Sequence, residues 1–252
     1  YDSQNTIPNK IIYNQNFNNK TKCMLTEEKF ISEVNSTIEK KSLLKHPFYQ
    51  KWNEGSLSKT ELQEYAKQYY HFVKHFPRFV SCVHSNCEDV KTRKILLENL
   101  ADEEGFKTGI EDHPRLWINF AESLGLTEAE VKSAQPIREV EDLVDGMYEL
   151  TRSPEFTLGL ASLYAYESQV PEISRTKIDG LKKFYGIDSD KAVEFFTVHE
   201  EADVYHSKDE MDIMVRNNLS LEDQKRLINT VDESATLMWN FLDGVYKNYC
   251  VN

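Results

Sequence analysis

Glycine, proline and cysteine are all scarce in this 252-residue chain, which contains 9 Gly, 7 Pro and 4 Cys. Because glycine and proline mark turns and helix ends, their scarcity indicates long regular elements joined by few tight turns. The cysteines form no Cys-X-X-Cys pair and no zinc pattern, and four in a chain of this length are too few to suggest a disulfide framework. We therefore expect a helical fold and free thiols in a reducing cytosol, at Cys23, Cys82, Cys87 and Cys250.

Positively charged residues are outnumbered by negatively charged ones, and long apolar runs are lacking. Lys and Arg total 30 against 42 Asp and Glu, a formal net charge of −12. Such an acidic chain has no electrostatic footprint for nucleic acid or an anionic membrane. No run of about 18 apolar residues exists to span a bilayer, and the first residues contain no apolar signal-peptide core. A cytoplasmic location is therefore expected.

Domain organisation follows from composition along the chain. Residues 1–22 are rich in asparagine and show no apolar periodicity, so we expect a flexible arm. The full sequence is 40% apolar, and the rest of the chain, 23–252, is long enough to bury a sizeable core. We expect it to form one domain.

Helical periodicity and capping residues recur throughout that domain. No alternating run with turn chemistry predicts a sheet, so the fold class is all-α, a helical bundle. A helix over about 88–104 is expected to bury Ile95, Leu96 and Leu100, and the run 156–170 is apolar almost all round, as in a core helix. Start signals lie at Thr26, Pro47, Ser58, Pro114, Thr127, Ser189 and Ser220.

The most informative stretch runs from Thr197 to His206. In a helix, His199, Asp203 and His206 stand at i, i+4 and i+7 and share one face. Two imidazoles and a carboxylate that point the same way supply three ligands for a first-row metal. The alternative is a polar helix face that meets water and shows this spacing by coincidence.

Two further suppliers of ligands follow from where charge is placed. Glu167 lies in the most apolar helix, where an ionised carboxylate is costly unless a metal or a salt bridge compensates it. The acids 102–104 stand at a helix C-terminus, where they oppose the macrodipole, and His113 follows. Solvated surface charge and helix capping are the alternatives for these residues.

Other candidates carry weaker signals. Tyr65 and Tyr69 share a helix face, a pattern more often explained by core packing than by chemistry. For Lys177, the default expectation is a lysine on a helix surface that is exposed to solvent. The remaining histidines lack carboxylates at ligand spacing and are left unassigned.

Four segments together resemble a known family: His46-Pro-Phe-Tyr49-Gln-Lys-Trp52, Asn99 to Glu104, Tyr164 to Pro171, and His199 to His206. They are similar to the chlamydial proteins that associate with death domains (CADD), over about residues 44–210. That family belongs to the haem-oxygenase-like diiron oxidases, within the fold shared by thiaminase-type (TenA) and pyrroloquinoline-quinone synthase-type (PqqC) proteins. The resemblance implies a haem-oxygenase-like helical bundle.

The resemblance also implies a site and a reaction. Matched position by position, the metal ligands fall on Glu103, His113, Glu167, His199, Asp203 and His206. Glu104 is the alternative to Glu103, because the segment before His113 looks longer here than in the chlamydial relative. Two iron ions are implied, with manganese the alternative in one position, together with O₂ and an external reductant. The implied activity is an oxygenase that makes 4-aminobenzoate for folate synthesis.

In that family the enzyme consumes its own side chains. The matching positions are Tyr49 as the carbon skeleton, Lys177 as the amino donor and Tyr65 as a nearby redox-active phenol. One alternative is a metal-free enzyme of the same fold, such as a hydrolase with a nucleophilic cysteine. Another is a secreted helical effector that binds host death-domain proteins. Related folds are often dimeric, so a homodimer is expected.

Overall fold

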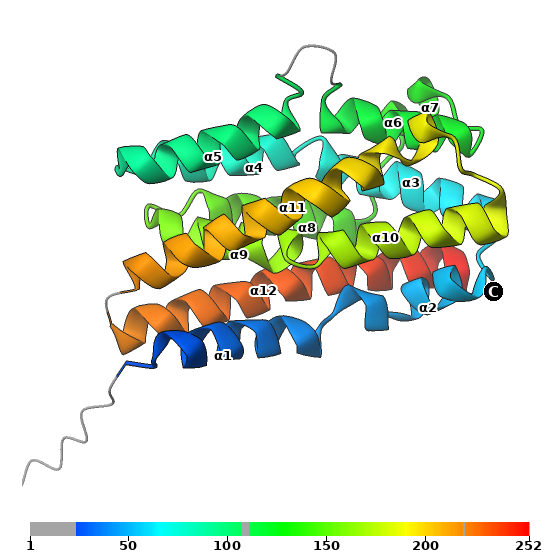
Figure 1. Cartoon of the computed structure of the whole chain (residues 1–252). Coiled ribbons are helices and arrows are strands. Elements are labelled where there is room, and N and C mark those ends of the chain that lie inside the picture. The colour runs from blue at the N-terminus through cyan, green and yellow to red at the C-terminus, as the bar shows by residue number, and fades with distance from the viewer. Residues whose placement is uncertain (1–23, 107–110, 219, 252) are drawn as a thin grey trace, which may run out of the picture.

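Helices make up all regular structure in residues 24–106, 111–218 and 220–251, the parts of the chain that this computed structural model describes (Figure 1). The first half contains α1 (Glu27–Lys40), η1 (Leu43–Lys45), α2 (Pro47–Glu54), α3 (Lys59–Val73), α4 (Phe76–Asn86), α5 (Val90–Glu103) and α6 (His113–Ser123). The second half contains α7 (Glu128–Ser133), α8 (Arg138–Thr151), α9 (Phe156–Glu167), α10 (Val170–Gly180), η2 (Leu181–Tyr185), α11 (Asp190–Asn217), α12 (Leu221–Val245) and η3 (Tyr246–Cys250). The predicted all-α class is confirmed.

The helices begin where the capping chemistry predicts. Thr26 accepts a hydrogen bond from the backbone N–H of Lys29. Ser58 opens α3 in a reciprocal capping box with Glu61, and α7 begins with the same motif. These side chains satisfy backbone N–H groups that have no partner inside the helix. Ser189 is an exception, because it precedes α11 without a side-chain capping bond.

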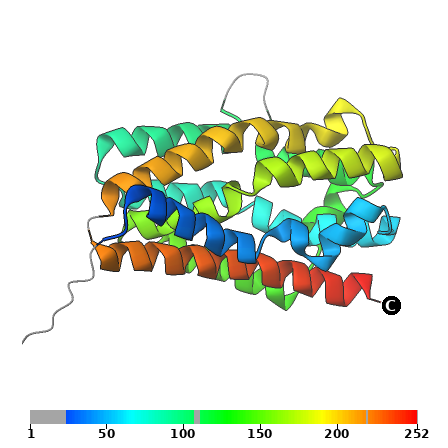
Figure 2. The same cartoon turned by 60° about the horizontal axis from the view of Figure 1, so that its bottom comes forward.

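The apolar helix α9 occupies the centre of the bundle. It packs against α12, α11, α8 and α4, and every residue of 159–167 is buried. The long helices α11 and α12 run beside it, and α12 is covered on another side by α1 (Figures 1 and 2). One continuous hydrophobic core joins these helices. Because α9 ends inside this core, its last residue, Glu167, is only 1% exposed.

Helix α5 buries a different face from the one expected. Its buried residues are Thr92, Leu96, Asn99 and Glu103, and three of these four are polar. Ile95 and Leu100 are only partly buried, at the edge of the core. The prediction of an apolar stripe was therefore right for Leu96 alone. The physical reason is that this face of α5 meets ionisable groups rather than apolar ones, as shown below.

Some expectations fall outside the described residues. These are the arm 1–22, Cys23 and the middle of the loop after α5, 107–110. None of the described helices combines the length and the apolarity that a bilayer crossing requires.

Candidate metal centre

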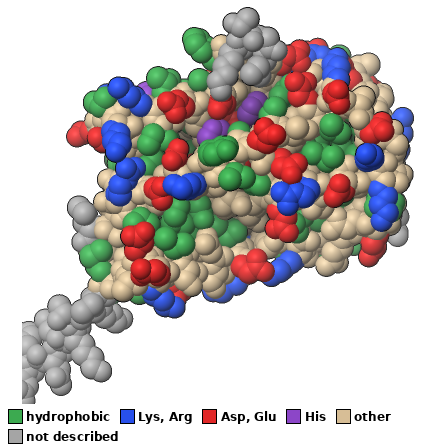
Figure 3. Space-filling view, viewed as in Figure 1, with side chains coloured by type: hydrophobic (Ala, Val, Ile, Leu, Met, Phe, Trp, Pro, Cys, Tyr) green, Lys and Arg blue, Asp and Glu red, His purple; other side chains and the backbone are tan. Residues whose placement is uncertain are grey.

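One face of the molecule is hollowed, and histidine side chains are visible within the hollow (Figure 3). A pocket of about 280 Å³ lies between the end of α5 and the middle of α11. His113 lines its inner wall, and the strongly exposed rings of Phe106 and Tyr205 stand at its rim. This pocket leads from the surface to a group of buried ionisable side chains.

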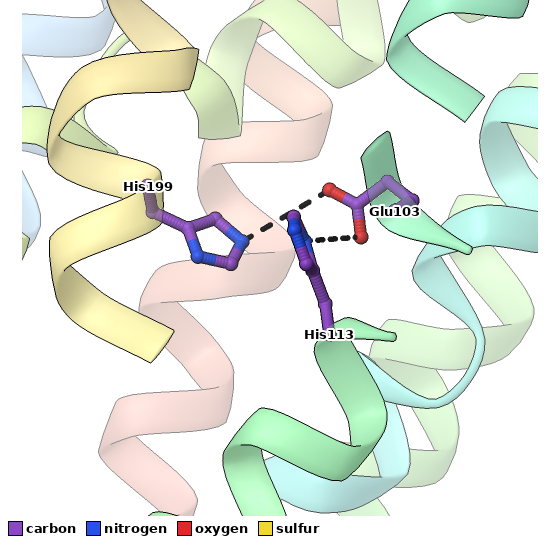
Figure 4. Close-up of side chains that lie close together, drawn as sticks. All are labelled: Glu103, His113 and His199. Carbon is purple, nitrogen blue, oxygen red and sulfur yellow. Dashed lines mark ion pairs between the residues drawn. The ribbon is translucent and has the colours of Figure 1, made fainter. Parts of the chain in front are cut away.

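The first cluster in that group joins three helices. Glu103 ends α5, His113 begins α6, and His199 lies in the middle of α11. Nδ1 of His113 is 2.9 Å from Oε2 of Glu103, and Nε2 of His199 is 3.9 Å from Oε1 of the same carboxylate (Figure 4). Each residue offers one ligand atom within 4.8 Å of the other two. All three are at least nine-tenths buried.

The second cluster contains Glu167, Asp203 and His206, again with ligand atoms within 4.8 Å of one another. Asp203 and His206 follow His199 on one face of α11, so this helix contributes to both clusters. The structure thus brings together all six residues matched as ligands. Glu103 is 2% exposed, whereas its alternative Glu104 lies on the surface.

Unpartnered polar atoms show that these clusters fit metal ions. Among the described residues, Nδ1 of His113, Oδ2 of Asp203 and Nδ1 of His206 are buried and make no hydrogen bond of strict geometry. The two imidazole nitrogens instead face carboxylate oxygens, at 2.9 Å from Glu103 and 3.4 Å from Asp203. Buried polar atoms are almost always paired, so several such atoms in one place fit a site that binds a cation. Glu167 makes no ion pair with Lys or Arg among the described residues; it accepts a hydrogen bond from Asn99 Nδ2 at 3.1 Å. The predicted salt-bridge alternative for Glu167 therefore has no partner here.

Hydrogen bonds to neighbouring residues orient the side chains of the two clusters. Nδ1 of His199 lies 2.5 Å from the backbone oxygen of Phe195, to which it donates, and this leaves Nε2 free to face Glu103. Such a bond fixes the tautomer and ring orientation of a metal-ligating histidine. Asn99 holds Glu167 in the same way. The polar stripe on α5 is explained by these contacts, because Asn99 and Glu103 both belong to it.

Burial and neighbouring charges shift the pKa values of the side chains in both clusters. Burial raises the pKa of Asp203 to about 7 and lowers the pKa of His199 to about 3. Burial alone would lower the pKa of His206, but its hydrogen bond with Asp203 and the nearby carboxylates raise it to about 9. Divalent cations would replace these shared protons and stabilise the carboxylates in their charged form.

Glu210 belongs to this region, and the sequence analysis missed it. It is 3% exposed, and both carboxylate oxygens lack a hydrogen-bond partner that meets strict geometry. Burial, followed by the adjacent charge of Glu167, raises its pKa well above the ordinary value. The signal was available, because Glu210 continues the face of α11 at the next turn after His206, at i+4.

A second group of candidates lies deeper in the core. Tyr49, Tyr65 and Lys177 are each at most 2% exposed. Nζ of Lys177 lies 2.7 Å from the hydroxyl of Tyr65 and 5.7 Å from the ring centroid of Tyr49. The default expectation of a solvated lysine is therefore wrong. Lys177 is buried because its helix, α10, packs against α2 and α11.

Burial lowers the pKa of Lys177 to about 7. Burying this charge with no counter-ion costs several kcal/mol, and desolvation is the cause of the shift. The aromatic rings around Nζ attract an ammonium and oppose the shift in part. The neutral amine is thus well populated near neutral pH. The rings lie 5.0–5.7 Å from Nζ and belong to Tyr49, Tyr65, Tyr69, Trp117 and Phe196.

The cavity beside this amine is very small, about 10 Å³. That volume holds about one water, whereas pockets for small-molecule ligands are typically about 300–1,000 Å³. The lining includes Tyr49, Tyr69, Tyr166 and Lys177. An added aromatic substrate does not fit there without rearrangement of the core.

The two buried cysteines are poor candidates for a nucleophile. Cys87 and Cys250 are free and buried, and burial raises the pKa of both thiols, that of Cys250 to about 12. A nucleophilic cysteine needs the opposite shift. These two residues therefore give no support to the cysteine hydrolase considered above.

Comparison with protein families gives one match, to the family model described as iron-containing redox enzyme, over residues 63–239. The matched range includes every residue of the two clusters.

Pairwise comparisons with individual proteins give similar results. The chain is 39% identical to a 4-aminobenzoate synthase from Nitrosomonas europaea over 88% of this chain and 93% of that one. It is 36% identical to a 4-aminobenzoate synthase from Chlamydia muridarum, over 85% and 89% of the two chains. Among solved structures, a TenA homologue from Pseudomonas syringae superposes with a TM-score of 0.74 at 18% identity, covering 87% of this chain and 92% of that one. This last match confirms the predicted fold.

Proposed function

The chain belongs to the family of iron-containing redox enzymes that includes the 4-aminobenzoate synthases, and from this premise we propose that it is an O₂-dependent dimetal oxygenase that makes 4-aminobenzoate from its own side chains. The observation that carries the proposal is the pairing of two buried three-ligand clusters with a buried Tyr49–Lys177–Tyr65 group. A metal-free hydrolase has no need for six such ligands, whereas a two-metal site in a helical bundle is built from such carboxylates and histidines.

In this proposal Glu103, His113 and His199 hold one metal ion, and Glu167, Asp203 and His206 hold the other. Bound iron would supply the binding and reduction of O₂, with electrons from an external reductant. The two positions differ in chemistry: the first has two imidazoles and one carboxylate, and the second has the reverse. Imidazole suits iron and carboxylate suits manganese. If manganese is used, we expect it in the second position.

The side chains of Tyr49 and Lys177 supply the product in this scheme. The phenol of Tyr49 provides the aromatic ring, and the amine of Lys177 provides nitrogen. Two features support these roles. The amine lies over the Tyr49 ring and is partly neutral near pH 7, so its lone pair is available. The adjoining cavity of about 10 Å³ leaves no space for a separate aromatic substrate.

Isotope labelling tests this proposal. Protein produced with ring-¹³C tyrosine, loaded with iron and manganese and given O₂ and reductant, should release ¹³C-labelled 4-aminobenzoate without added substrate. Tyr49→Phe should abolish the label. Tyr148→Phe is the matched control, because Tyr148 is an aromatic residue of α8 whose hydroxyl bonds His75 at 2.8 Å, and it should leave the yield unchanged. Many turnovers on an added small molecule, with intact Tyr49, would contradict the proposal.

A further inference from the structure

A second surface pocket, separate from the one that leads to His113, lies where α1 and η1 meet the junction of α9 and α10. Its volume is about 360 Å³, within the range of about 300–1,000 Å³ that is typical of sites for small molecules. Each of these elements contributes to its lining, through Asn35 of α1, Leu44 of η1, Tyr164 of α9 and Glu172 of α10. The pocket is therefore large enough for a small aromatic compound.

This pocket adjoins the cavity of about 10 Å³ beside Tyr49 and Lys177. The side chain of Ile173 on α10 lines both spaces. On η1, Leu43 lines the cavity and the next residue, Leu44, lines the pocket. The wall between the two spaces is thus formed by Ile173 and by η1. The pocket that leads to His113, in contrast, shares no lining residue with the cavity.

This wall is the side of the cavity that opens at the lowest cost. It contains a short 3₁₀ helix of three residues, η1, whose Leu43 N–H donates a hydrogen bond to Oε1 of Gln169 at 3.0 Å. The opposite walls are aromatic rings of the close-packed core, such as Tyr69, Phe195 and Phe241. A local opening of a short connecting segment costs less free energy than a rearrangement of a packed core. A displacement of Ile173 and η1 would join the cavity to the pocket.

The charges around the pocket favour passage of an anion over its retention. Among the described residues, no Lys, Arg or His lines the pocket, whereas Glu39 and Glu172 do. Glu39 forms an ion pair with Lys45, and Glu172 is exposed. A carboxylate in the pocket would meet serine hydroxyls and amides but no cation, and the charge of Glu172 would repel it. An aromatic carboxylate that enters from the core would therefore continue into water.

We propose that this pocket is the exit for the product, a small aromatic carboxylate, and that it opens to the Tyr49 cavity by a displacement of Ile173 and η1. This inference rests on the proposed function, because it gives a route to the product released from Tyr49. No covalent bond forms or breaks in the step; the Leu43–Gln169 hydrogen bond opens and then closes again. None of the six residues of the two clusters lines the cavity or this pocket, so the product leaves without displacing a metal ligand.

Labelling of an introduced thiol tests this route independently of activity. Ser174 lines the cavity and is 2% exposed, so Ser174→Cys places a thiol at the inner end of the route. The probe is 4-(chloromercuri)benzoate, a benzoate that carries mercury where the product carries its amine, and it forms a mercury–sulfur bond with a thiol. The protein is loaded with iron and manganese and kept without O₂. Mass spectrometry of peptides then counts this thiol separately from the native cysteines.

Two matched substitutions in the same background distinguish the two surface pockets. Glu172→Trp places a large ring in the mouth of the proposed exit, and Glu201→Trp does the same at the pocket that leads to His113. Both glutamates are exposed on helices. Glu172→Trp should slow labelling by about tenfold or more, and Glu201→Trp should leave its rate unchanged. Equal rates in Glu172→Trp and its parent, no labelling in the parent, or a larger slowing by Glu201→Trp would overturn the exit.

Product release gives a second readout in protein that retains Ser174. After reaction with O₂ and reductant, acid-quenched samples give the total 4-aminobenzoate, and rapid filtration gives the part already released. Glu172→Trp should lower the released share of the total at early times, whereas Glu201→Trp should give the wild-type share. A wild-type share in Glu172→Trp would also overturn the exit. Wild-type protein that makes no 4-aminobenzoate contradicts the proposed function, and the labelling rates still decide on the exit.

Discussion

At the scale of residues, this core differs from that of an ordinary helical bundle in how many ionisable groups it buries. Glu103, Glu167, Asp203 and Glu210 are each at most 3% exposed. A buried carboxylate without a cation costs several kcal/mol, and four of them in one region would destabilise any metal-free fold. The placement of Glu103, Glu167 and Asp203 on α5, α9 and α11 is therefore explained by the metals that they are proposed to hold. Glu210 lies in contact with Glu167.

Glu210 gives a direct test of this electrostatic cost. Its pKa is raised in the folded state, so it keeps its proton while the unfolded chain releases its own. Stability is lost as pH rises above about 4.5, the ordinary value. In metal-free protein at pH 8, Glu210→Gln should raise the free energy of unfolding by about 1–3 kcal/mol. Urea titration measures this gain, which should vanish below pH 4.5.

Glu201→Gln is the control for that experiment, since Glu201 is exposed on the same helix and should change stability little. If Glu210 also supports the second metal, Glu210→Gln should in addition lower metal retention after dialysis. A metal-free Glu210→Gln protein that is less stable than wild type at pH 8 would contradict this reading of Glu210.

Lys177 is a second residue whose burial should measurably lower the free energy of unfolding. Its pKa of about 7 in the folded state is below the unfolded value, so the folded state becomes relatively less stable as pH falls from about 10.4 towards 7. Lys177→Met should therefore raise the free energy of unfolding at pH 7 by about 2–3 kcal/mol, after allowance for the aromatic contacts. The gain should be smaller at pH 10, and 4-aminobenzoate formation should be lost. Equal stability at both pH values would argue against a desolvated amine.

At the scale of elements, the sequence predicted helix starts far better than helix faces. Capping chemistry is local, so Thr26, Ser58 and Thr127 act as their neighbours in the chain dictate. The buried face of α5 depends instead on what other helices bring to it. Asn99 is buried because Glu167 of α9 needs a donor, and no pattern within α5 indicates that.

The close approach of α9 to its neighbours gives an element-scale prediction. A Cβ atom at Gly159 would lie 2.8 Å from Val83 Cγ2 and 3.2 Å from the backbone of Thr151, so α4 and α8 would have to move. Gly159→Ala should lower the free energy of unfolding by about 1–3 kcal/mol. Thermal unfolding followed by circular dichroism measures this change.

Gly146→Ala is the matched control, because its Cβ would meet only the flexible end of Leu237. A helical alanine is intrinsically better than glycine by about 1 kcal/mol, so this variant should be nearly neutral or slightly more stable. If both substitutions had the same effect, close packing of α9 would not be the cause.

At the scale of the whole molecule, the fold class and the six residues that gather in the two clusters could be predicted from the sequence, for different reasons. Periodicity and capping predict an all-α bundle, whereas the resemblance matched the ligands. The burial of Lys177 and its contact with Tyr65 could not be predicted, because both depend on how α10 and α3 meet in space. Glu210 could have been predicted, because it is a fourth member of the face of α11 that already contains His199, Asp203 and His206.

The expected homodimer remains a prediction at this scale. The apolar face of α12 is buried against α9, α8 and α1 within one chain, so its amphipathic pattern needs no partner. A dimer would therefore use other surfaces. Size-exclusion chromatography with light scattering should give twice the mass of one 29.4 kDa chain, and a mass equal to one chain at micromolar concentration would contradict the expectation.

The central claim is that two metal ions occupy the two clusters, and anomalous X-ray scattering tests it most directly. Crystals of the purified protein, measured on both sides of the iron and manganese absorption edges, should show two peaks. One should lie among Glu103, His113 and His199, and the other among Glu167, Asp203 and His206. Asp203→Asn should weaken the second peak and leave the first. Fully active crystals that show no anomalous peak at either cluster would contradict the account.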